Sequence, residues 1–544
     1  MIIHRKKLFY IYFFSSIFYL VDFEEKINTL VYLEKSLKIK LMITLLVCLF
    51  VTSINQSVVS IAGPSIVAAL GGFEYYAWIF SAFSLTSAIC VPIVGKLNDI
   101  YGAKKVILYS LIIFTFSTLL CGLSNSMFFF IFSRAIQGIG FAGVMGTIWI
   151  LIASLWAPKE RGKWLGITSA GFTTSGVIGP IFGGLVNDLF NWRWIFYLNI
   201  PISIFAIIFL IKIFPKQELL EKKKFDYFGA LVFSIFASTF LFAISSLNNS
   251  SSTLSISFFL LIAISLISLG SFLYYEKNNP EGLVDLSLFK YKFFTGGMLG
   301  SLFIVISWTV WSVFLPLTLI GVNGYSASKA SLALIALSVG SAVGANFFGN
   351  LIGRPKMYLP VSIIGFSVVG ISMVISGYTN LEINFNLMLL LALFVGFGST
   401  GAFSAYTVPI QNNLPEERLA IITTSLQFSR VFGISLGSSL LGVILLLNMN
   451  SYSYESPRNE IYNPDNIASV EKIQEIKNSY VESNLSDSQF DEDLRISRNN
   501  LKNGLRIVYY SASVTAVFGI LISIYVFRKF SPHQSEEEDS KQNE

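Results

Sequence analysis

The sequence predicts an all-α membrane protein with about fourteen membrane-spanning helices, and three observations support this class. Hydrophobic residues make up 53% of the 544 residues and charged residues only 13%, which is too apolar for an ordinary soluble protein. From Lys40 onward, one apolar run follows another, each long enough to cross a bilayer. The basic residues are scattered in short clusters between these runs, so the net charge of +6 reflects membrane topology and not a nucleic-acid partner.

Before the first span, Leu8 to Val21 is apolar but shorter than the roughly 20 residues that a spanning helix needs. An uncleaved signal-like segment, an interfacial helix and an extension upstream of the functional start all fit, and we favour a peripheral helix. From residue 41 the chain contains runs that are apolar over about 18 residues or more. Their expected limits are 41–64, 77–97, 106–123, 127–154, 164–186, 193–213, 227–247, 254–275, 294–321, 328–352, 357–378, 384–410, 419–446 and 506–528.

The connections between these spans alternate in charge. One set is poor in Lys and Arg, for example Ser124–Ser126 and Asn248–Ser251. The positive-inside rule places the other, basic set in the cytoplasm together with the C-terminus, in a multi-pass protein of the cell membrane. The basic set contains Lys104 and Lys105; Lys159, Arg161 and Lys163; Lys216 and Lys222–Lys224; Lys277, Lys290 and Lys292; Arg354 and Lys356; Arg418; and Arg528 and Lys529.

Two Lys-rich stretches divide the spans into six, two and six. In the polar segment between the last two spans, which we place outside the cell, only Val470 to Tyr480 has the pattern of an amphipathic helix. The expected parts are an N-terminal extension (1–40), a six-helix bundle (41–214), two linking helices with their cytoplasmic loops (215–292), a second six-helix bundle (293–446 and 506–528), an extracellular polar loop (447–505) and a cytoplasmic tail (529–544).

Several kinds of site are not expected in this chain. Cys48, Cys90 and Cys121 fall inside apolar runs without metal-like spacing, so we interpret them as packing residues. There is no Gly-rich phosphate-binding motif ending in Lys-Ser or Lys-Thr, which argues against an ATPase. We therefore expect no enzyme, metal or cofactor. The expected partners are the lipid bilayer and a small-molecule substrate, with protons as the candidate coupling ion, and we expect a monomer.

The residues from Gly95 to Lys105 join the second and third spans. Gly102 is placed to end a helix in a left-handed conformation, and two lysines follow it in a turn that suits the cytoplasmic side. A basic turn with one capping acid would explain this pattern. The stretch also resembles a loop signature of the major facilitator superfamily, Gly-x-Leu-x-Asp-x-x-Gly-x-(Arg/Lys)-(Arg/Lys). By that resemblance the acid faces the other half of the molecule and helps to hold one conformational state. The switch residues are Gly95, Asp99, Gly102, Lys104 and Lys105.

Arg134 and Gln137 lie inside the fourth span. A cation at this depth costs several kcal/mol unless it faces protein or water, which makes Arg134 a functional candidate. The alternative is a structural hydrogen bond to neighbouring carbonyl groups. The run from Ser133 to Gly140 resembles the fourth-helix facilitator motif Arg-x-x-Gln-Gly-x-Gly. That resemblance implies a role in handling substrate or protons.

The fifth span is rich in glycine, which allows two helices to approach closely. Simple packing would account for this pattern. The run from Ser175 to Gly184 nevertheless resembles the antiporter motif of the facilitator exporters, Gly-x-x-x-Gly-Pro-x-x-Gly-Gly, with serine in place of the first glycine. This resemblance favours export over uptake. The matching residues are Gly179, Pro180, Gly183 and Gly184.

The sixth span opens with an aromatic string from Trp192 to Pro201. Interfacial anchoring alone could explain it, but the string closely resembles the sixth-helix entry of the fourteen-helix drug:proton antiporters. That family has an acid in the first span, within Leu-Asp-x-Thr-Ile-Val-Asn-Val-Ala-Leu-Pro. Here the corresponding residues are Ile54 to Pro64, and Asn55 stands at the acid's position. An amide cannot carry a proton, so coupling by the usual acid and a preference for cationic drugs are both in doubt.

The polar and aromatic residues of the spans suggest a central cavity whose lining is neutral or basic and suits an anionic or neutral amphipathic substrate. The resemblance implies a secondary transporter that exports small amphipathic molecules or drugs by alternating access. Two alternatives remain. One is a facilitated carrier or importer of organic anions. The other is a membrane receptor or partner protein that does not transport and that needs the 447–505 segment but not Arg134. The expected cavity residues are Asn55, Gln56, Gln137, Trp149, Trp308, Trp311, Tyr406, Gln427 and Arg430.

Overall fold

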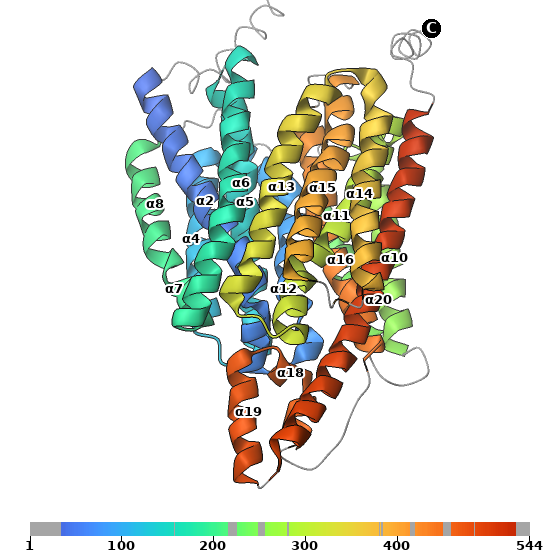
Figure 1. Ribbon diagram of the computed structural model, residues 1–544. Helices are drawn as coiled ribbons and strands as arrows, with labels where there is room; N and C mark the ends of the chain where they lie inside the picture. The colour runs from blue at the N-terminus through green and yellow to red at the C-terminus, as the bar shows by residue number, and fades with distance from the viewer. Residues whose placement is uncertain are drawn as a thin grey trace, which may run out of the picture.

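The protein is a bundle of long, roughly aligned helices in the computed structural model (Figure 1). The structure describes residues 34–156, 158–215, 226–247, 256–279, 282–379, 381, 384–413, 419–449, 458–483 and 485–528. In these ranges 14 helical segments are long and apolar enough to cross a membrane, in the predicted order. The predicted all-α membrane fold is therefore confirmed. The expected peripheral helix at 8–21 and the tail at 529–544 lie outside the described residues.

The first six spans form one bundle. The sixth span is broken after Tyr197, because Pro201 has no N–H to donate to the carbonyl group one turn earlier. Cys48 and Cys121 are buried in this bundle and are free thiols, as expected for packing residues. Its helices are α2 (Lys35–Leu70), α3 (Trp78–Tyr101), α4 (Ala103–Gly122), α5 (Met127–Leu155), α6 (Pro158–Leu189), α7 (Trp192–Tyr197) and α8 (Asn199–Ile213).

The two linking helices pack against each other at the seam between the bundles. The first of them, Tyr227–Ser246, contacts α3 on one side, where the ring centroids of Trp78 and Phe242 are 4.8 Å apart. On its other side it contacts α16, where the ring centroids of Phe233 and Phe428 are 5.3 Å apart. The predicted arrangement of six, two and six helices is thus present. The linking helices are α9 (Tyr227–Ser246) and α10 (Ile256–Asn278).

The second bundle contains the last six spans. Its first span widens into two π-helical turns, at Val310–Phe314 and Thr318–Val322, on either side of Pro316, whose missing N–H disturbs regular α-helical bonding. The helices are α11 (Lys292–Thr309), α12 (Leu315–Leu317), α13 (Ala327–Ile352), α14 (Tyr358–Tyr378), α15 (Phe385–Asn413), α16 (Leu419–Leu447) and α20 (Asp487–Phe527).

The polar segment before the last span is more ordered than the sequence suggests. The predicted helix at 470–480 is confirmed as α19 (Val470–Glu482), but α17 (Arg458–Tyr462) and α18 (Pro464–Ile467) are also helical. In addition, α20 starts about 20 residues earlier than expected, at Asp487, and projects beyond the bundles beside α19 (Figure 1). We call this end of the molecule the α19 end, and the opposite end, where α20 finishes at Phe527, the tail end.

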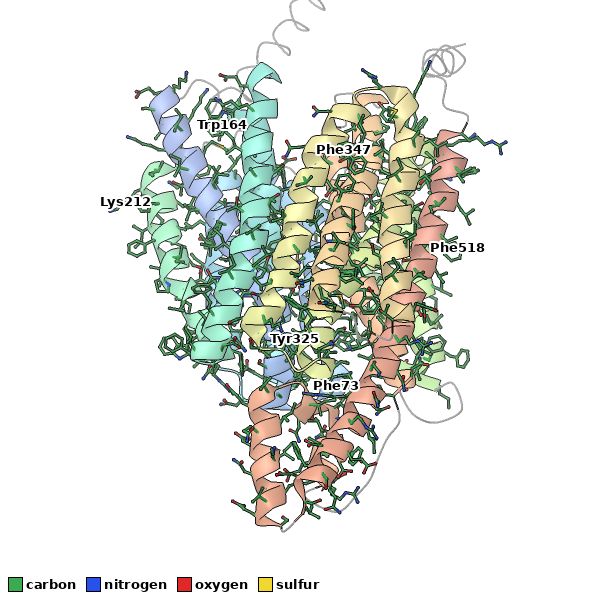
Figure 2. All side chains as sticks on the ribbon, in the orientation of Figure 1. Phe73, Trp164, Lys212, Tyr325, Phe347 and Phe518 are labelled. Carbon is green, nitrogen blue, oxygen red and sulfur yellow. The ribbon has the colours of Figure 1, made fainter. Side chains whose placement is uncertain are left out.

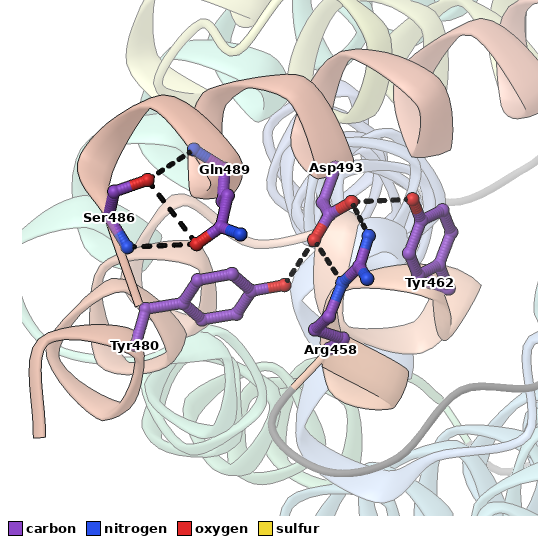
Figure 3. A network of polar contacts seen from close by, with 6 residues as sticks. All are labelled: Arg458, Tyr462, Tyr480, Ser486, Gln489 and Asp493. Carbon is purple, nitrogen blue, oxygen red and sulfur yellow. Dashed lines mark hydrogen bonds and ion pairs between the residues drawn. The ribbon is translucent and has the colours of Figure 1, made fainter. Parts of the chain in front are cut away.

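A buried carboxylate holds this small helical region together (Figure 3). Asp493 of α20 is 2% exposed and accepts two hydrogen bonds from Arg458, at 2.7 and 2.9 Å. The hydroxyl groups of Tyr462 and Tyr480 donate to the same carboxylate at 2.7 and 3.0 Å. Four charge-assisted hydrogen bonds thus tie α17 and α19 to α20. Composition alone could not reveal this, because the apolar residues that become buried here, such as Ile461, Ile476 and Phe490, are scattered among many polar and charged ones.

Candidate functional site

A cavity of about 170 Å³ lies between the two bundles and takes its lining from both. The first bundle contributes Gln56 of α2, Arg134 of α5 and Pro180 of α6, and the second contributes Trp308 of α11. These residues were all predicted from the sequence as candidates. The remaining wall is apolar or carries hydroxyl groups, and no described lining residue is a carboxylate. The hydroxyl-bearing residues are Ser53, Ser57, Ser60, Ser84, Thr173, Ser175, Ser312, Ser338 and Ser341.

Arg134 is 1% exposed, and neutral oxygen atoms surround its guanidinium group. Nε donates to the carbonyl oxygen of Ile79 at 3.2 Å, and Nη1 donates to Asn55 Oδ1 at 3.2 Å and to Gln137 Oε1. The guanidinium carbon also lies 4.3 Å from the centre of the Phe83 ring, a favourable position for a cation. Two of the predicted residues, Asn55 and Gln137, therefore lie behind Arg134 and hold it in place.

The orientation of Gln137 is fixed by a further contact. Its amide nitrogen donates to Thr118 Oγ1 of α4 at 2.7 Å, which turns the amide oxygen toward Arg134. Thr118 in turn donates to the carbonyl oxygen of Phe114 at 2.6 Å. The result is a polar network that runs from α4 through α5 to α2 inside the first bundle. Such a network restricts the arginine to one direction, toward the cavity.

The glycines of the α6 motif allow close packing in two places, one within the first bundle and one between the bundles. A Cβ atom on Gly179 would lie 2.7 Å from Ser57 Cβ, and one on Gly183 would lie 3.0 Å from Val58 Cγ1, so both allow α6 to pack closely on α2. Gly184 instead faces the other bundle, where a Cβ atom would lie 2.9 Å from the Cα atom of Ser328 in α13. One glycine of the motif thus permits contact between the bundles.

The bundles meet between the cavity and the α19 end. The carboxylate of Asp188, at the end of α6, accepts hydrogen bonds from the N–H groups of Ala327 and Ser328, which open α13, at 3.1 and 2.8 Å. Ser81 Oγ of α3 lies 2.6 Å from Ser438 Oγ of α16, and the Tyr76 hydroxyl donates to the Val313 carbonyl oxygen at 2.7 Å. The sequence analysis missed these residues. Figure 2 shows Phe73 of the first bundle and Tyr325 of the second at this same closed end.

The tail end carries the predicted switch loop. Gly102 has a positive φ angle of 80°, but its ψ angle of 148° lies outside the left-handed helical region, so the predicted left-handed conformation is corrected to an extended one with positive φ. Lys104 Nζ donates to the carbonyl oxygen atoms of Ile211, at 3.4 Å, and Phe214. Lys104 therefore caps the end of α8 in its own bundle. Asp99 and Lys105 are exposed, and a Cβ atom on Gly95 would meet nothing within 4 Å.

Three predicted cavity aromatics lie elsewhere in this structure. Trp311 is fully buried and packs edge-on against Tyr509, with ring centroids 5.9 Å apart. Tyr406 fits over Gly300 and bonds Ser523 Oγ at 2.7 Å, while Trp149 packs on the apolar core of the first bundle. None of the three is among the residues that line this cavity, because the sequence does not say how each helix is rotated. Their part in transport stays a prediction.

Arg430 also lies outside the cavity lining. It donates from Nη2 to Thr407 Oγ1 at 2.5 Å and lies 4.9 Å above the Phe403 ring, so it joins α16 to α15. Its partners within the described residues are neutral, as are those of Arg134. Its role as a transport or coupling residue stays a prediction.

A cavity that two helical bundles share, closed toward one end of the molecule, defines a membrane transporter of the alternating-access class. A family model described as Major Facilitator Superfamily matches residues 45–438, and the chain belongs to this family. Its members are transporters and not enzymes.

Curated relatives support the same conclusion. The chain is 30% identical to the multidrug transporter protein MdtP of Bacillus subtilis (strain 168), over 76% of each protein. It is 27% identical to multidrug resistance protein 3 of the same organism, over 74% of this chain and 78% of the relative.

Solved structures share the fold. A bacterial homolog of the human lysosomal transporter Spinster, inward-facing and unoccupied, has a TM-score of 0.59 at 16% identity, with 92% of this chain and 98% of that chain covered. The human organic anion transporter MFSD10 (TETRAN) has a TM-score of 0.55 at 11% identity, with 89% and 99% covered.

Proposed function

We propose that the protein is a secondary transporter that exports small amphipathic molecules from the cell by alternating access. The observation that carries this proposal is the shared cavity, whose apolar and hydroxyl-bearing walls come from both bundles. Rocking of the bundles would expose this site first to one side and then to the other. The multidrug relatives and the glycine motif with Gly179, Pro180, Gly183 and Gly184 favour export over uptake.

We infer that the tail end faces the cytoplasm. Lys104, Lys105 and Arg354 lie there, as the positive-inside rule requires. The α19 end is then extracellular, and the present conformation is closed toward the outside. We place the protein in the cell membrane, acting as a monomer whose two bundles form a complete site.

The coupling ion is a separate question. The described cavity lining contains no carboxylate, and Asn55 holds the position at which the resembling antiporters have an acid. If protons drive transport, an acid outside the cavity has to carry them, and we name Asp99 of the switch loop as the candidate. Its movement with the end of α3 would link protonation to the change of conformation.

The test is uptake of a lipophilic dye into proteoliposomes, with and without an imposed pH gradient. Saturable uptake that the gradient accelerates supports proton-coupled export, and empty liposomes set the background. Uptake that follows only the dye's own gradient would replace export by a facilitated carrier. Loss of coupling in Asp99→Asn, with uptake down the dye's gradient retained, would support the assigned role of Asp99.

A further inference from the structure

We propose that the cavity binds the anionic group of its substrate through Arg134, and that Asn55 is the residue that leaves this positive charge available. The inference rests on the proposed transport function and specifies its substrate class: an organic anion with an apolar body. It depends on three features of the cavity, namely the uncompensated charge of Arg134, its direction and the unpartnered polar atoms beside it.

The charge of Arg134 is solvated by protein but not neutralised. Its hydrogen-bond acceptors are two side-chain amides and one backbone carbonyl group, all of which are neutral. In the described part of the chain, no carboxylate forms an ion pair with it. A buried cation without an anionic partner is costly in a membrane protein unless a ligand or water completes its surroundings. The cavity therefore has a positive potential when it is empty.

The direction of the guanidinium group is also fixed. Nε and Nη1 are engaged on the protein side, whereas Nη2 forms no hydrogen bond within the described residues. Arg134 is one of the residues that line the cavity, so Nη2 is the nitrogen left to donate to a bound molecule. An N–H group of a cation donates most strongly to a carboxylate, sulfonate or phosphate oxygen.

Two polar atoms beside the arginine have no partner in the described structure. Ser53 Oγ, which lines the cavity, and Asn55 Nδ2 are both buried without a hydrogen bond. Buried donors of this kind normally have an acceptor, because an unpaired donor has lost its hydrogen bonds to water without replacement. Ser53 Oγ, on the cavity wall, can donate to a remaining oxygen atom of an anion held by Arg134, whereas Asn55 Nδ2 lies behind the arginine. The aromatic rings of Phe80 and Trp308 supply the apolar wall for the rest of the substrate.

Asn55 decides whether this charge is available. Its Oδ1 atom lies 3.2 Å from Arg134 Nη1, so an aspartate with the same geometry would place a carboxylate directly against the guanidinium group. Opposite charges in contact attract strongly where water is excluded, because little solvent screens them. The aspartate would therefore neutralise the cavity and compete with an anionic substrate.

The experiment measures binding of three probes with the same ring system to the full-length protein in lipid nanodiscs. The probes are naphthalene-2-sulfonate, the neutral naphthalene-2-sulfonamide and the cation 2-naphthylmethylammonium. The unmodified protein is expected to bind the sulfonate at least about 10-fold more tightly than the other two. Asn55→Asp should remove this preference. Asn448→Asp adds the same charge at the exposed end of α16 and should leave it unchanged.

Two variants, Arg134→Lys and Arg134→Gln, distinguish the effect of the positive charge on binding from the effect of losing the arginine's shape. Lysine should retain a weaker preference for the sulfonate, because the charge remains, whereas glutamine should lose it. A sulfonate preference that survives in both Asn55→Asp and Arg134→Gln would overturn the inference. Tighter binding of the neutral probe or the cation by the unmodified protein would also overturn the inference. The proposed transport function would still be supported if the same protein transports dye in proteoliposomes. Failure of dye export with sulfonate binding intact would instead overturn the proposed function alone.

Discussion

Asp493 and Arg134 are both almost completely buried, and their surroundings are opposite. Asp493, at the α19 end, is paired with Arg458 and two tyrosines, so its charge is fully compensated. Arg134, at the cavity, has only neutral partners. A compensated buried charge fixes the position of the elements that supply its partners. An uncompensated one facing a cavity remains able to bind a ligand.

The largest difference between the two buried side chains is expected in substrate transport, which Arg134→Ala should impair. Losing the one cation of the described cavity lining should lower substrate flux by about 100-fold, since a charge-assisted contact is worth about 1.5–3 kcal/mol and the polar network loses its centre. Flux into proteoliposomes is the measurement. Arg528→Ala removes an exposed arginine at the end of α20 and should have no effect. Equal flux in the two variants would refute a functional role for Arg134.

Replacing Asp493, whose charge is compensated, should lower the stability of the region around it and leave transport unchanged. Asp493→Ala leaves Arg458, Tyr462 and Tyr480 without their common acceptor and should destabilise the α17–α19 region by about 2–3 kcal/mol. Hydrogen exchange of α19 measures this effect. Asp491→Ala removes an exposed acid from the same helix and serves as the control. If Asp493→Ala abolished flux while α19 stayed protected, the contrast between the two charges would be wrong.

The same carboxylate predicts how this region responds to pH. Burial alone would raise the pKa of Asp493, but the hydrogen bonds from Arg458, Tyr462 and Tyr480 outweigh burial and hold the pKa below its usual value. A lowered pKa stabilises the folded form above the unfolded pKa of about 3.9, and this contribution disappears as pH falls through the folded value. Protection of α19 should therefore stay constant from pH 8 to about pH 5 and decrease only below about pH 4. A loss already near pH 6 would contradict this assignment.

The sequence predicted one of these charges and not the other for physical reasons. Arg134 was evident because a cation within an apolar run needs an explanation. Asp493 lies in a segment full of charges, where nothing in the local pattern marks the residue that becomes buried. The helices were predictable from their length and hydropathy. The directions in which Trp311 and Tyr406 point were not predictable. A helix inside a bundle is apolar on every side, so its rotation about its axis depends on packing.

The smallest effect is expected at Asp188, which is an intermediate case. Like Arg134 it has neutral partners, the N–H groups of Ala327 and Ser328, but it is exposed, so water can replace them. Removing a capping acid from a helix N-terminus costs about 1 kcal/mol. Because this cap joins the two bundles, Asp188→Ala should shift the population about 5-fold toward conformations open at the α19 end, without changing the unfolding temperature. Distances between spin labels on α6 and α13 at that end measure the shift, with Asp487→Ala, at the exposed start of α20, as the control. An unchanged distance distribution would mean that the glycine and serine contacts alone keep this end closed.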